Sequence, residues 1–451
     1  MNFPPAFLKR MQKLLGPEFE DFVTALRQPP PVSIRFNPRK PGAQLPTSER
    51  VPWHPHGWYL HERPSFTLDP AYHGGGYYIQ EASSMFLHEI LCQIRPSSER
   101  WRVLDLCAAP GGKSTLLLSA MQEGDLLVAN EMAPARVPAL KYNLTRWGYS
   151  GVMASNHPPA AFTNLKGFFD LIVVDAPCSG EGMFRKDPGA LEHWSPTAAE
   201  QCAERQDSII DQVLPALRAG GWLIYSTCTF NPSENEYNIA RWLQRYDLEE
   251  VPLRLDSSHP LVPAEHGYYF YPHRVKGEGF FICLMRKKSG TSFKAKKLGL
   301  PRGITRLPSR QANFLRPWLG NADRFLFYQK ANGTITALTP DLEADFATLG
   351  NVLQKRSFGL KIGKLKGSHL LPDHALAMCL ELSEDVPTLQ LDLEAALQYL
   401  KRAEPPLPSL PKPGWYLVRH GAFNLGWVKV LSQRINNYLP MDNRIRMDLP
   451  E

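Results

Sequence analysis

Two cysteines stand at positions where a folded chain could use them for chemistry. Cys178 lies in Asp-Ala-Pro-Cys-Ser-Gly-Glu, residues 175–181, and Cys228 lies in Ser-Thr-Cys-Thr, residues 226–229. Each follows a short apolar run that is typical of a buried strand. Ligands of open α/β sheets bind at the carboxyl ends of the strands, so both thiols and Asp175 are predicted to face one crevice. The alternative is two unrelated cysteines, each acting as a small buried apolar residue.

A thiol and an acid beside a methyl donor suit one particular reaction. Carbon 5 of cytosine is a poor nucleophile until a thiolate adds to carbon 6. An acid near ring nitrogen 3 must then stabilise the charge that develops there, and Asp175 is the candidate. A free thiol is only a few per cent thiolate at neutral pH, so a nearby cation is expected. Lys113 and Arg185 are the candidate cations.

A glycine-rich turn predicts the methyl donor. Residues 105–114 read Asp-Leu-Cys-Ala-Ala-Pro-Gly-Gly-Lys-Ser between a predicted strand and a predicted helix, whose first N–H groups can bind an anion. The dinucleotide pattern GxGxxG is absent, and Cys107 replaces the first glycine of a phosphate loop. Glu131 ends the next strand, where doubly wound folds bind ribose hydroxyls. A loop and an acid without a phosphate signature together predict S-adenosylmethionine.

The segments that carry these residues have an α/β pattern. Apolar runs alternate with helical patterns, which predicts a mostly parallel, doubly wound sheet covered on both faces. The N-terminus predicts a helix followed by a short strand, and the C-terminus predicts β-hairpins. Predicted strands are 32–36, 102–106, 126–130, 169–175, 221–227, 280–285, 414–418 and 425–430, and predicted helices are 6–27, 113–122, 133–147 and 197–217.

Changes in composition divide the 451 residues into segments. Residues 286–322 carry ten Lys or Arg and no acid, which is typical either of a solvated tether or of a segment that contacts RNA. The predicted units are a small N-terminal α+β unit (1–75), an α/β domain (76–287), a basic linker (288–310), an accessory domain (311–384) and a β-rich domain (385–451).

The composition also restricts the partner and the compartment. The formal net charge of +7 favours an acidic partner such as nucleic acid. No apolar run is long enough for a membrane span, and the N-terminus lacks a signal-peptide pattern. Seven cysteines without a CxxC pair argue against a disulfide framework and indicate a reducing cytoplasm. The histidines show no metal-ligand spacing, so no metal site is predicted.

Long motifs make the sequence similar to the RNA cytosine-C5 methyltransferases of the Nop/Sun family. Within that family it most resembles the bacterial branch that acts on 16S ribosomal RNA of the small subunit. That branch has a C-terminal PUA-like RNA-binding domain, which residues 385–451 resemble. The resemblance implies a seven-stranded-type S-adenosylmethionine methyltransferase fold, and a cytoplasmic monomer that acts on ribosomal RNA or the small ribosomal subunit, without DNA or membrane as partner. The matching segments are 77–85, 105–114, 175–186, 226–236 and 272–274.

The same resemblance implies roles for individual residues. Cys228 corresponds to the nucleophile, Cys178 to the cysteine that assists product release, Asp175 to the acid that contacts the cytosine, and Lys113 to a lysine near the reacting centre. Many members bind the adenine through an aspartate after the third strand, where this chain offers Asn156. The implied cofactor-binding residues are Cys107, Ala108, Ala109, Pro110, Gly111, Gly112, Lys113, Glu131, Arg136, Asn156 and Asp175.

Two other functions stay open. A transfer RNA could be the substrate of the same chemistry, or the chain could be a ribosome-assembly factor that binds RNA without turnover. The intact cysteines argue against the second function. A DNA substrate is disfavoured because the Pro-Cys-Gln pattern of DNA cytosine methyltransferases is absent.

Two local features complete the sequence predictions. Ser233 and Glu236 predict a capping box that opens a helix of about 14 residues. Arg185 and Lys186 predict contact with a phosphate of the target.

Overall fold

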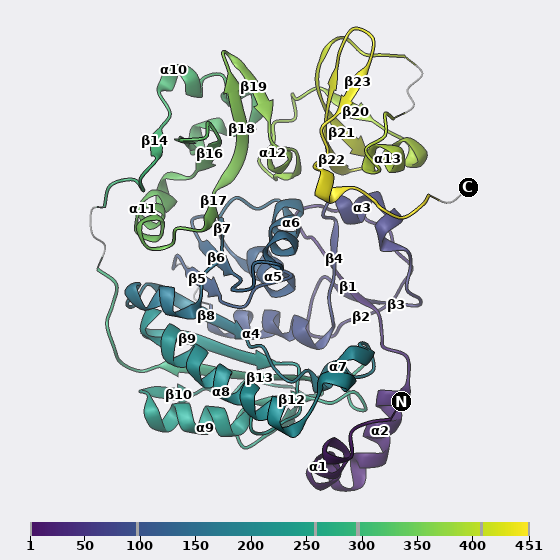
Figure 1. The fold of residues 1–451 in the computed structure, drawn as a ribbon, viewed down its shortest axis with the longest axis vertical. Coiled ribbons are helices and arrows are strands. Elements are labelled where there is room, and N and C mark those ends of the chain that lie inside the picture. Colours follow the sequence, from purple (N-terminus) through teal and green to yellow (C-terminus); the bar gives the residue numbers. More distant parts are fainter. Residues whose placement is uncertain (1, 96–98, 257–258, 295–297, 406–408, 450–451) are drawn as a thin grey trace.

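The computed structural model describes residues 2–95, 99–256, 259–294, 298–405 and 409–449. Lys296 and Lys297 of the basic segment lie outside the described residues. Figure 1 shows a large sheet with its helices in the centre and lower half of the molecule, and the C-terminal segments (green and yellow) above it. The first two helices lie beside the far end of the sheet, away from the C-terminal segments.

The central sheet has ten strands in the described residues, in the order β11-β12-β13-β9-β8-β5-β6-β7-β17, with β10 paired to β13. Its centre, from β9 to β7, is parallel. The α/β prediction is therefore confirmed, although antiparallel strands extend both edges beyond a seven-stranded sheet. The strands are β5 (Arg102–Asp105), β6 (Leu126–Asn130), β7 (Val152–Ser155), β8 (Phe169–Asp175), β9 (Leu217–Thr227), β10 (Leu248–Glu250), β11 (Val262–Pro263), β12 (Tyr268–Phe270), β13 (Phe280–Lys287) and β17 (Arg356–Phe358).

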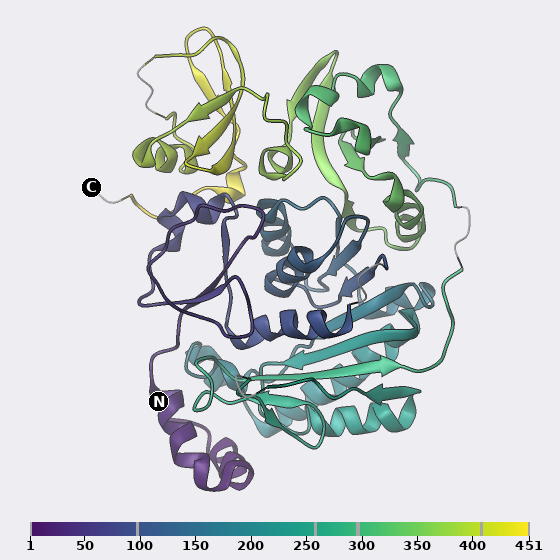
Figure 2. The same cartoon turned by 180° about the vertical axis from the view of Figure 1, so that it is seen from behind.

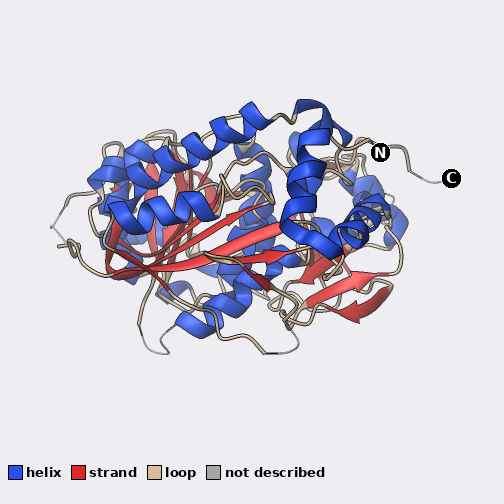
Figure 3. Cartoon of the chain, turned by 90° about the horizontal axis from the view of Figure 1, so that it is seen from below, coloured by secondary structure: helices blue, strands red, loops and turns tan. Residues whose placement is uncertain are grey.

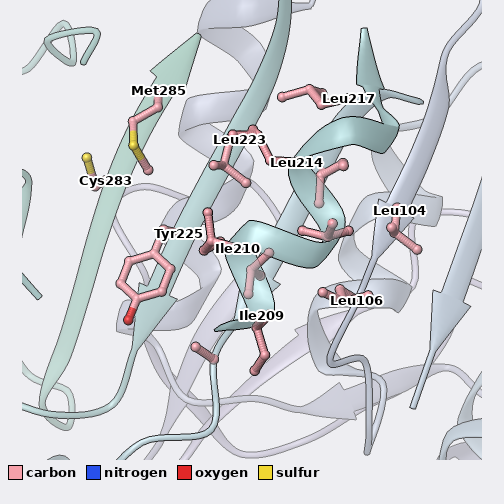
Figure 4. Close-up of a cluster of buried hydrophobic side chains, with 14 of the residues drawn as sticks. Leu104, Leu106, Ile209, Ile210, Leu214, Leu217, Leu223, Tyr225, Cys283 and Met285 are labelled. Carbon is pink, nitrogen blue, oxygen red and sulfur yellow. The ribbon is translucent and has the colours of Figure 1, made fainter. Parts of the chain in front are cut away.

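Helices cover both faces of this sheet (Figure 3). On one face α8 packs its buried residues Ile209 and Ile210 onto the apolar side chains of the parallel strands, among them Leu104 and Leu223 (Figure 4). This packing fixes the position of the parallel strands whose ends carry the candidate site. The helices are α4 (Leu87–Ile94), α5 (Gly112–Ala120), α6 (Val137–Trp147), α7 (Pro188–His193), α8 (Pro196–Val213) and α9 (Glu236–Arg245).

Among its described residues, the N-terminal unit contains three α-helices and a four-stranded sheet of order β2-β3-β1-β4. β4 lies beyond the expected boundary at residue 75, because its residues pair with β1. Phe7 of the first helix packs edge-on against Phe184, with ring centroids 5.0 Å apart, close behind the loop of Cys178. The elements are α1 (Pro5–Leu15), α2 (Phe19–Arg27), β1 (Ser33–Phe36), β2 (Thr47–Arg50), β3 (Gly57–Leu60), α3 (Pro70–His73) and β4 (Tyr77–Ile79).

The C-terminal region forms two further sheets, of order β14-β15-β16-β18-β19 and β20-β21-β22-β23. The β-rich prediction is thus confirmed, and β14 falls within the segment that was expected to be a linker. The elements are β14 (Ile304–Arg306), β15 (Leu326–Lys330), β16 (Ile335–Leu338), α11 (Glu343–Val352), β18 (Leu360–Lys366), β19 (His369–Pro372), α12 (His374–Met378), β20 (Thr388–Gln390), α13 (Leu393–Leu400), β21 (Gly414–His420), β22 (Phe423–Val430) and β23 (Ile435–Asn437).

The accessory region is tied into the central sheet. β17 pairs antiparallel with β7, placing Ser357 opposite Ala154 (Figures 1 and 2). Asp345 of α11 is 1% exposed, and its carboxylate accepts a hydrogen bond from Arg102 of β5 at 2.9 Å and another from Arg100. This region therefore completes one edge of the sheet that carries the candidate site.

Candidate active site

The two cysteine loops meet at the carboxyl ends of adjacent strands. β8 ends at Asp175 just before Cys178, and β9 ends at Thr227 just before Cys228. Since β8 and β9 are parallel neighbours, both loops leave the same edge of the sheet. The Cys178 and Cys228 Sγ atoms lie 3.2 Å apart, and both thiols are free and half-buried.

Two buried glutamates hold these loops together reciprocally. Glu181, in the loop of Cys178, accepts a hydrogen bond from the backbone N–H of Phe230 at 3.2 Å. Glu234, after Cys228, accepts one from the backbone N–H of Ser179 at 2.9 Å. Both side chains are fully buried. Each loop thus supplies a carboxylate to the backbone of the other.

Both glutamates have further partners outside the two loops. Trp194 and Arg10 bind Glu181, at 2.9 and 2.6 Å, which connects α1 to the site. Gln206 of α8 donates to Glu234 at 3.0 Å. Burial raises the pKa of both carboxyls. The sequence predictions did not include these two residues, because nothing in a single sequence separates a buried glutamate from a solvated one.

Lys113 and Asp175 form an ion pair beside the thiols. The Lys113 Nζ lies 2.7 Å from Asp175 Oδ2, and the Ser226 hydroxyl donates to Asp175 Oδ1 at 2.8 Å. Lys113 belongs to the first turn of α5, so it joins the glycine loop to the tip of β8. Its ammonium also lies 5.0 Å from the ring centroid of Phe280.

An open cavity of about 290 Å³ contains most of these groups. Cys228, Asp175 and Lys113 line it. Among the described residues, Cys178 is not part of this lining, so it lies behind Cys228 as seen from the cavity. The remaining loop residues in the lining are Cys107, Ala108, Ala109, Pro110 and Gly112.

The glycine loop is shaped for close approach of a ligand. Gly111 has a φ of 116°, which other residues rarely adopt, and it caps the N-terminus of α5. A Cβ on Gly112 would lie 3.3 Å from a ring carbon of Tyr78. Gly112 and Lys113 are the first residues of α5 and line the cavity, so the start of this helix lies at the cavity wall.

Glu131 lies at the tip of β6 with one unsatisfied oxygen. It is 5% exposed, and its Oε1 accepts from the backbone N–H of Ala133 at 2.8 Å. Its Oε2 is buried and has no hydrogen-bond partner, although Arg136 lies 3.5 Å away. Arg136 donates to the Ala109 carbonyl, which links β6 to the glycine loop. A buried acceptor of this kind can bind a ligand hydroxyl.

Asn156 lies apart from the cavity of Cys228. Its side-chain amide donates to the carbonyls of Glu131 and Met132, at 2.7 and 3.0 Å. It lines a separate groove that faces the C-terminal region. Its proposed contact with adenine therefore stays a prediction.

The protonation states differ across the site. The hydrogen bond with Cys228 and burial both raise the pKa of the Cys178 thiol well above its ordinary value. Burial also raises the pKa of Cys107. Burial raises the pKa of Asp105 to about 7. The hydrogen bond that Ser114 donates to this carboxylate, at 2.6 Å, lowers the pKa and so opposes part of the rise.

Arg185 does not fulfil the prediction made for it. Its Nε lies 2.6 Å from Glu278 Oε2, and its other nitrogens donate to the carbonyls of Ala25 and Gly277. The side chain is 5% exposed, so this guanidinium is fully engaged inside the protein. The prediction that Arg185 contacts a target phosphate is therefore wrong.

The capping box at Ser233 is also absent. Helix α9 begins only at Glu236, and its N-cap is Asn235, which makes no side-chain cap. The backbone N–H of Ser233 donates to Asn231 Oδ1 at 3.1 Å, so Ser233 lies in a turn. Glu236 instead accepts from the Tyr269 hydroxyl at 2.6 Å.

The described residues hold neither a metal-binding cluster nor a helix that could span a membrane. They contain no group of three or more His, Cys, Asp or Glu side chains that could hold a metal ion. In the same parts of the chain, every helix is too short or too polar to cross a membrane.

Three family models match the chain. Residues 92–286 match the 16S rRNA methyltransferase RsmB/F model. Residues 3–82 match the N-terminal domain of 16S rRNA methyltransferase RsmF, and residues 386–445 match the methyltransferase RsmF PUA domain. The matched segments thus follow one another from the N-terminal helices to the last sheet.

Two curated relatives match over nearly the full length, and a third matches over about two thirds of it. The ribosomal RNA small subunit methyltransferase F of Cronobacter sakazakii is 30% identical over 97% of this chain and 96% of its own. The protein of the same name from Shigella boydii is 30% identical over 98% of this chain and 96% of its own. With the Erwinia tasmaniensis protein of that name, identity is 35%, and the match spans 63% of each chain.

Two solved structures resemble a little under two thirds of the chain. A methyltransferase homolog protein from Pyrococcus horikoshii matches with a TM-score of 0.54 and 29% identity, over 63% of this chain and 96% of its own. NSun6 from the same organism matches in fold, with a TM-score of 0.53 and 20% identity, over 64% of this chain and 99% of its own. From these matches and the nearly full-length relatives, the chain belongs to the RsmF branch of the RsmB/F family of 16S rRNA methyltransferases.

Proposed function

We propose that the protein transfers a methyl group from S-adenosylmethionine to carbon 5 of a cytosine in 16S ribosomal RNA, through a covalent adduct with Cys228. The observation that carries this proposal is the single cavity lined by Cys228, Asp175, Lys113 and the glycine loop. The names of the nearly full-length relatives, which are small-subunit ribosomal RNA methyltransferases, support the substrate class.

The residues around the glycine loop fit S-adenosylmethionine, which supplies the methyl group. The unpartnered Oε2 of Glu131 is a ready acceptor for a ribose hydroxyl. The N-terminus of α5 suits the carboxylate of the methionine portion, and Gly112, which lines the cavity, lets it approach the backbone. Arg136 fixes the position of Glu131 relative to the glycine loop, because it contacts both the glutamate and the carbonyl of Ala109.

In the mechanism that we propose, Cys228 attacks from the cavity wall. Its thiolate forms a bond to carbon 6, so that carbon 5 gains the electron density to take the methyl group. In this proposal Asp175, which lines the cavity, stabilises the charge that develops at ring nitrogen 3, and Lys113 fixes the orientation of this carboxylate. Water in the open cavity then takes the proton from carbon 5. The electron pair of the broken C–H bond restores the double bond between carbons 5 and 6, and the carbon–sulfur bond breaks to return Cys228 as a thiolate.

Cys178 is suited to the release step in this mechanism. Its raised pKa keeps its proton at neutral pH, so its S–H can donate to the sulfur of Cys228 at 3.2 Å. A donor at that position stabilises the thiolate when Cys228 departs. The division of roles between the two thiols is thus consistent with which one faces the cavity.

The partners are part of the same proposal. The cavity of Cys228, the PUA domain and the net charge of +7 favour ribosomal RNA or the small subunit as the substrate, and we propose a cytoplasmic monomer. A transfer RNA remains the alternative substrate, and an assembly factor without turnover the alternative function.

Methyl transfer from labelled S-adenosylmethionine tests all three functions. Purified protein should label 16S RNA or small subunits and leave transfer RNA unlabelled. Bisulfite sequencing of RNA from a strain that lacks the gene should locate the cytosine. Label in transfer RNA alone would favour the alternative substrate, and no label in any RNA would favour an assembly factor.

A further inference from the structure

A strongly basic groove lies between the central sheet and the C-terminal region. It consists of two adjoining cavities of about 640 and 440 Å³, bounded by α6 and β7 on one side and by β16, β17, β18 and α12 on the other. We call it the basic groove. Its charged lining consists of the cations Lys141, Lys330, Lys355, Arg356 and Lys361 and the carboxylates Asp373 and Asp442.

Most of these cations lack an acidic partner. Lys361 pairs with Asp373 at 2.6 Å. In the described parts of the chain, no ion pair within 4.0 Å reaches the other four cations. The mechanism proposed above uses none of them.

The cations are close enough to repel one another. Burial lowers the pKa of Lys330, and the charges of Arg356, Lys361 and Lys141 lower it further. Arg356 directs its guanidinium at the carbonyls of Leu353 and Gln354, which leaves its charge uncompensated. Such a cluster is stabilised by a bound anion.

One end of the groove lies at the same sheet edge as the candidate active site, and its other end lies near the start of β7. Asn156, directly after β7, lines the groove, and Asp175, at the end of β8, lines the cavity of Cys228. Both strands belong to the parallel centre, in the order β8-β5-β6-β7. Three strand spacings, about 14 Å, separate the two positions. A chain that leaves the groove can therefore reach the cavity.

We propose that the basic groove binds the phosphodiester backbone of the RNA strand that carries the target cytosine. This inference rests on the proposed function. The cations are spread over two adjoining cavities instead of converging on one point, which suits successive phosphates of a strand better than one free phosphate. The groove thus guides the RNA between the sheet and the C-terminal region.

A pair of charge-removing substitutions tests the groove. Lys141→Gln/Lys355→Gln removes two exposed cations that have no ion pair in the described residues. The matched control, Lys166→Gln/Lys294→Gln, also removes two exposed lysines. Lys166 lies just before the start of β8. Lys294 lies nearby, because the backbone N–H of its neighbour Phe293 donates to the carbonyl of Gly167. The two control lysines are therefore at the sheet edge opposite the strand ends of the candidate site.

The measurement is equilibrium binding of a single-stranded fragment of 16S RNA to the full chain over a series of salt concentrations. Two lost phosphate contacts should reduce the slope of log K against log salt by about 1.4. The groove variant should bind about 10-fold more weakly at low salt. The control should keep the wild-type slope, and both variants should bind S-adenosylmethionine as the wild type does.

The outcomes separate the two proposals, because RNA binding is measured without turnover. The wild-type protein could fail to label any RNA while the groove variant still shows a reduced slope of log K against log salt. That result would disprove the proposed function and support RNA binding by the basic groove. Normal methyl transfer, together with equal slopes of log K against log salt in the wild type and the groove variant, would overturn only the proposal that the basic groove binds RNA. Inorganic phosphate that binds the wild type but not the groove variant, with the RNA slope unchanged, would also overturn it in favour of free phosphate.

Discussion

The sulfur atoms of Cys178 and Cys228 lie 3.2 Å apart, although 50 residues separate the two cysteines in the chain. Two thiols in contact cannot both be charged without strong repulsion, so one keeps its proton while the other reacts. Cys228 lines the cavity, and the pKa of Cys178 is raised by its bond to Cys228 and by burial. This asymmetry supports the proposed division of roles, in which Cys228 attacks and Cys178 assists release.

Substitution of each thiol should produce opposite effects on the covalent adduct. Cys228→Ala should abolish methyl transfer and covalent capture of RNA, because the nucleophile is lost. Cys178→Ala should slow release and leave a protein–RNA adduct that survives a denaturing gel. Cys202→Ala, at another free half-buried cysteine, is the control and should behave as wild type. An adduct with Cys228→Ala instead of Cys178→Ala would reverse the assignment.

The reciprocal glutamates should affect turnover more than cofactor binding. Glu234→Ala removes the acceptor for the Ser179 N–H, so the Cys178 loop is no longer held against Cys228. Because a misplacement of about 1 Å can cost about 100-fold in rate, kcat should fall about 10- to 100-fold. The KM for S-adenosylmethionine should change little, since Glu234 does not line the cavity among the described residues. Steady-state kinetics measure both constants.

Two further variants distinguish positioning from a loss of folding. Glu234→Gln keeps one acceptor oxygen and should restore part of the rate. Glu236→Gln changes a buried glutamate in the same segment whose partner, Tyr269, lies outside the Cys178 loop, and it should retain nearly normal kcat. A kcat for Glu234→Ala equal to that of Glu236→Gln would show that the contact between the loops has no role in catalysis.

The buried carboxyl of Asp105 should make stability depend on pH. Its pKa is about 7 in the folded protein, above the ordinary value of 3.8, and its Oδ1 has no partner. The folded state therefore holds a proton that the unfolded state releases, so stability falls as pH rises from about 4 through about 7. Asp105→Asn should flatten this fall and gain stability relative to wild type near pH 8, by a few kcal/mol at most.

Urea unfolding near pH 5 and near pH 8 measures this effect. Asp125→Asn is the control, because Asp125 accepts hydrogen bonds from Arg95 and from the backbone of Trp101, at 2.6 and 2.7 Å. It should lose stability at both pH values. An Asp105→Asn variant that follows the wild-type pH profile would contradict the assigned titration.

The parallel centre of the sheet was predictable because its strands are buried on both faces. Such strands are continuous apolar runs, and the predicted range 169–175 coincides with β8. The carboxyl ends of parallel strands share one edge, so the meeting of the two cysteine loops followed from the strand pattern. The roles of the two cysteines did not follow from it and came from the family resemblance.

Contacts between distant segments were not predictable from local patterns. Arg185 is a charged residue of a type that is usually found on the surface. In the fold its guanidinium is buried, because it binds the carboxylate of Glu278, 93 residues later. The sequence around Ser233 matched the pattern of a helix start. In the structure Ser233 lies in a turn instead, where its backbone N–H donates to the side chain of Asn231. The pairing of β17 with β7 depends on a match between strands about 200 residues apart, which one sequence does not reveal.

That last pairing has a consequence for how the protein is made. β7 would be an open edge strand without residues 356–358, and an open edge offers unpaired N–H and C=O groups to any extended chain nearby. As synthesis proceeds from the N-terminus, this edge stays open long after the rest of the parallel strands have been made. A ribosome that stalls between the two segments would therefore release a chain prone to aggregate, and a shortened chain that ends near residue 290 would carry the same hazard permanently.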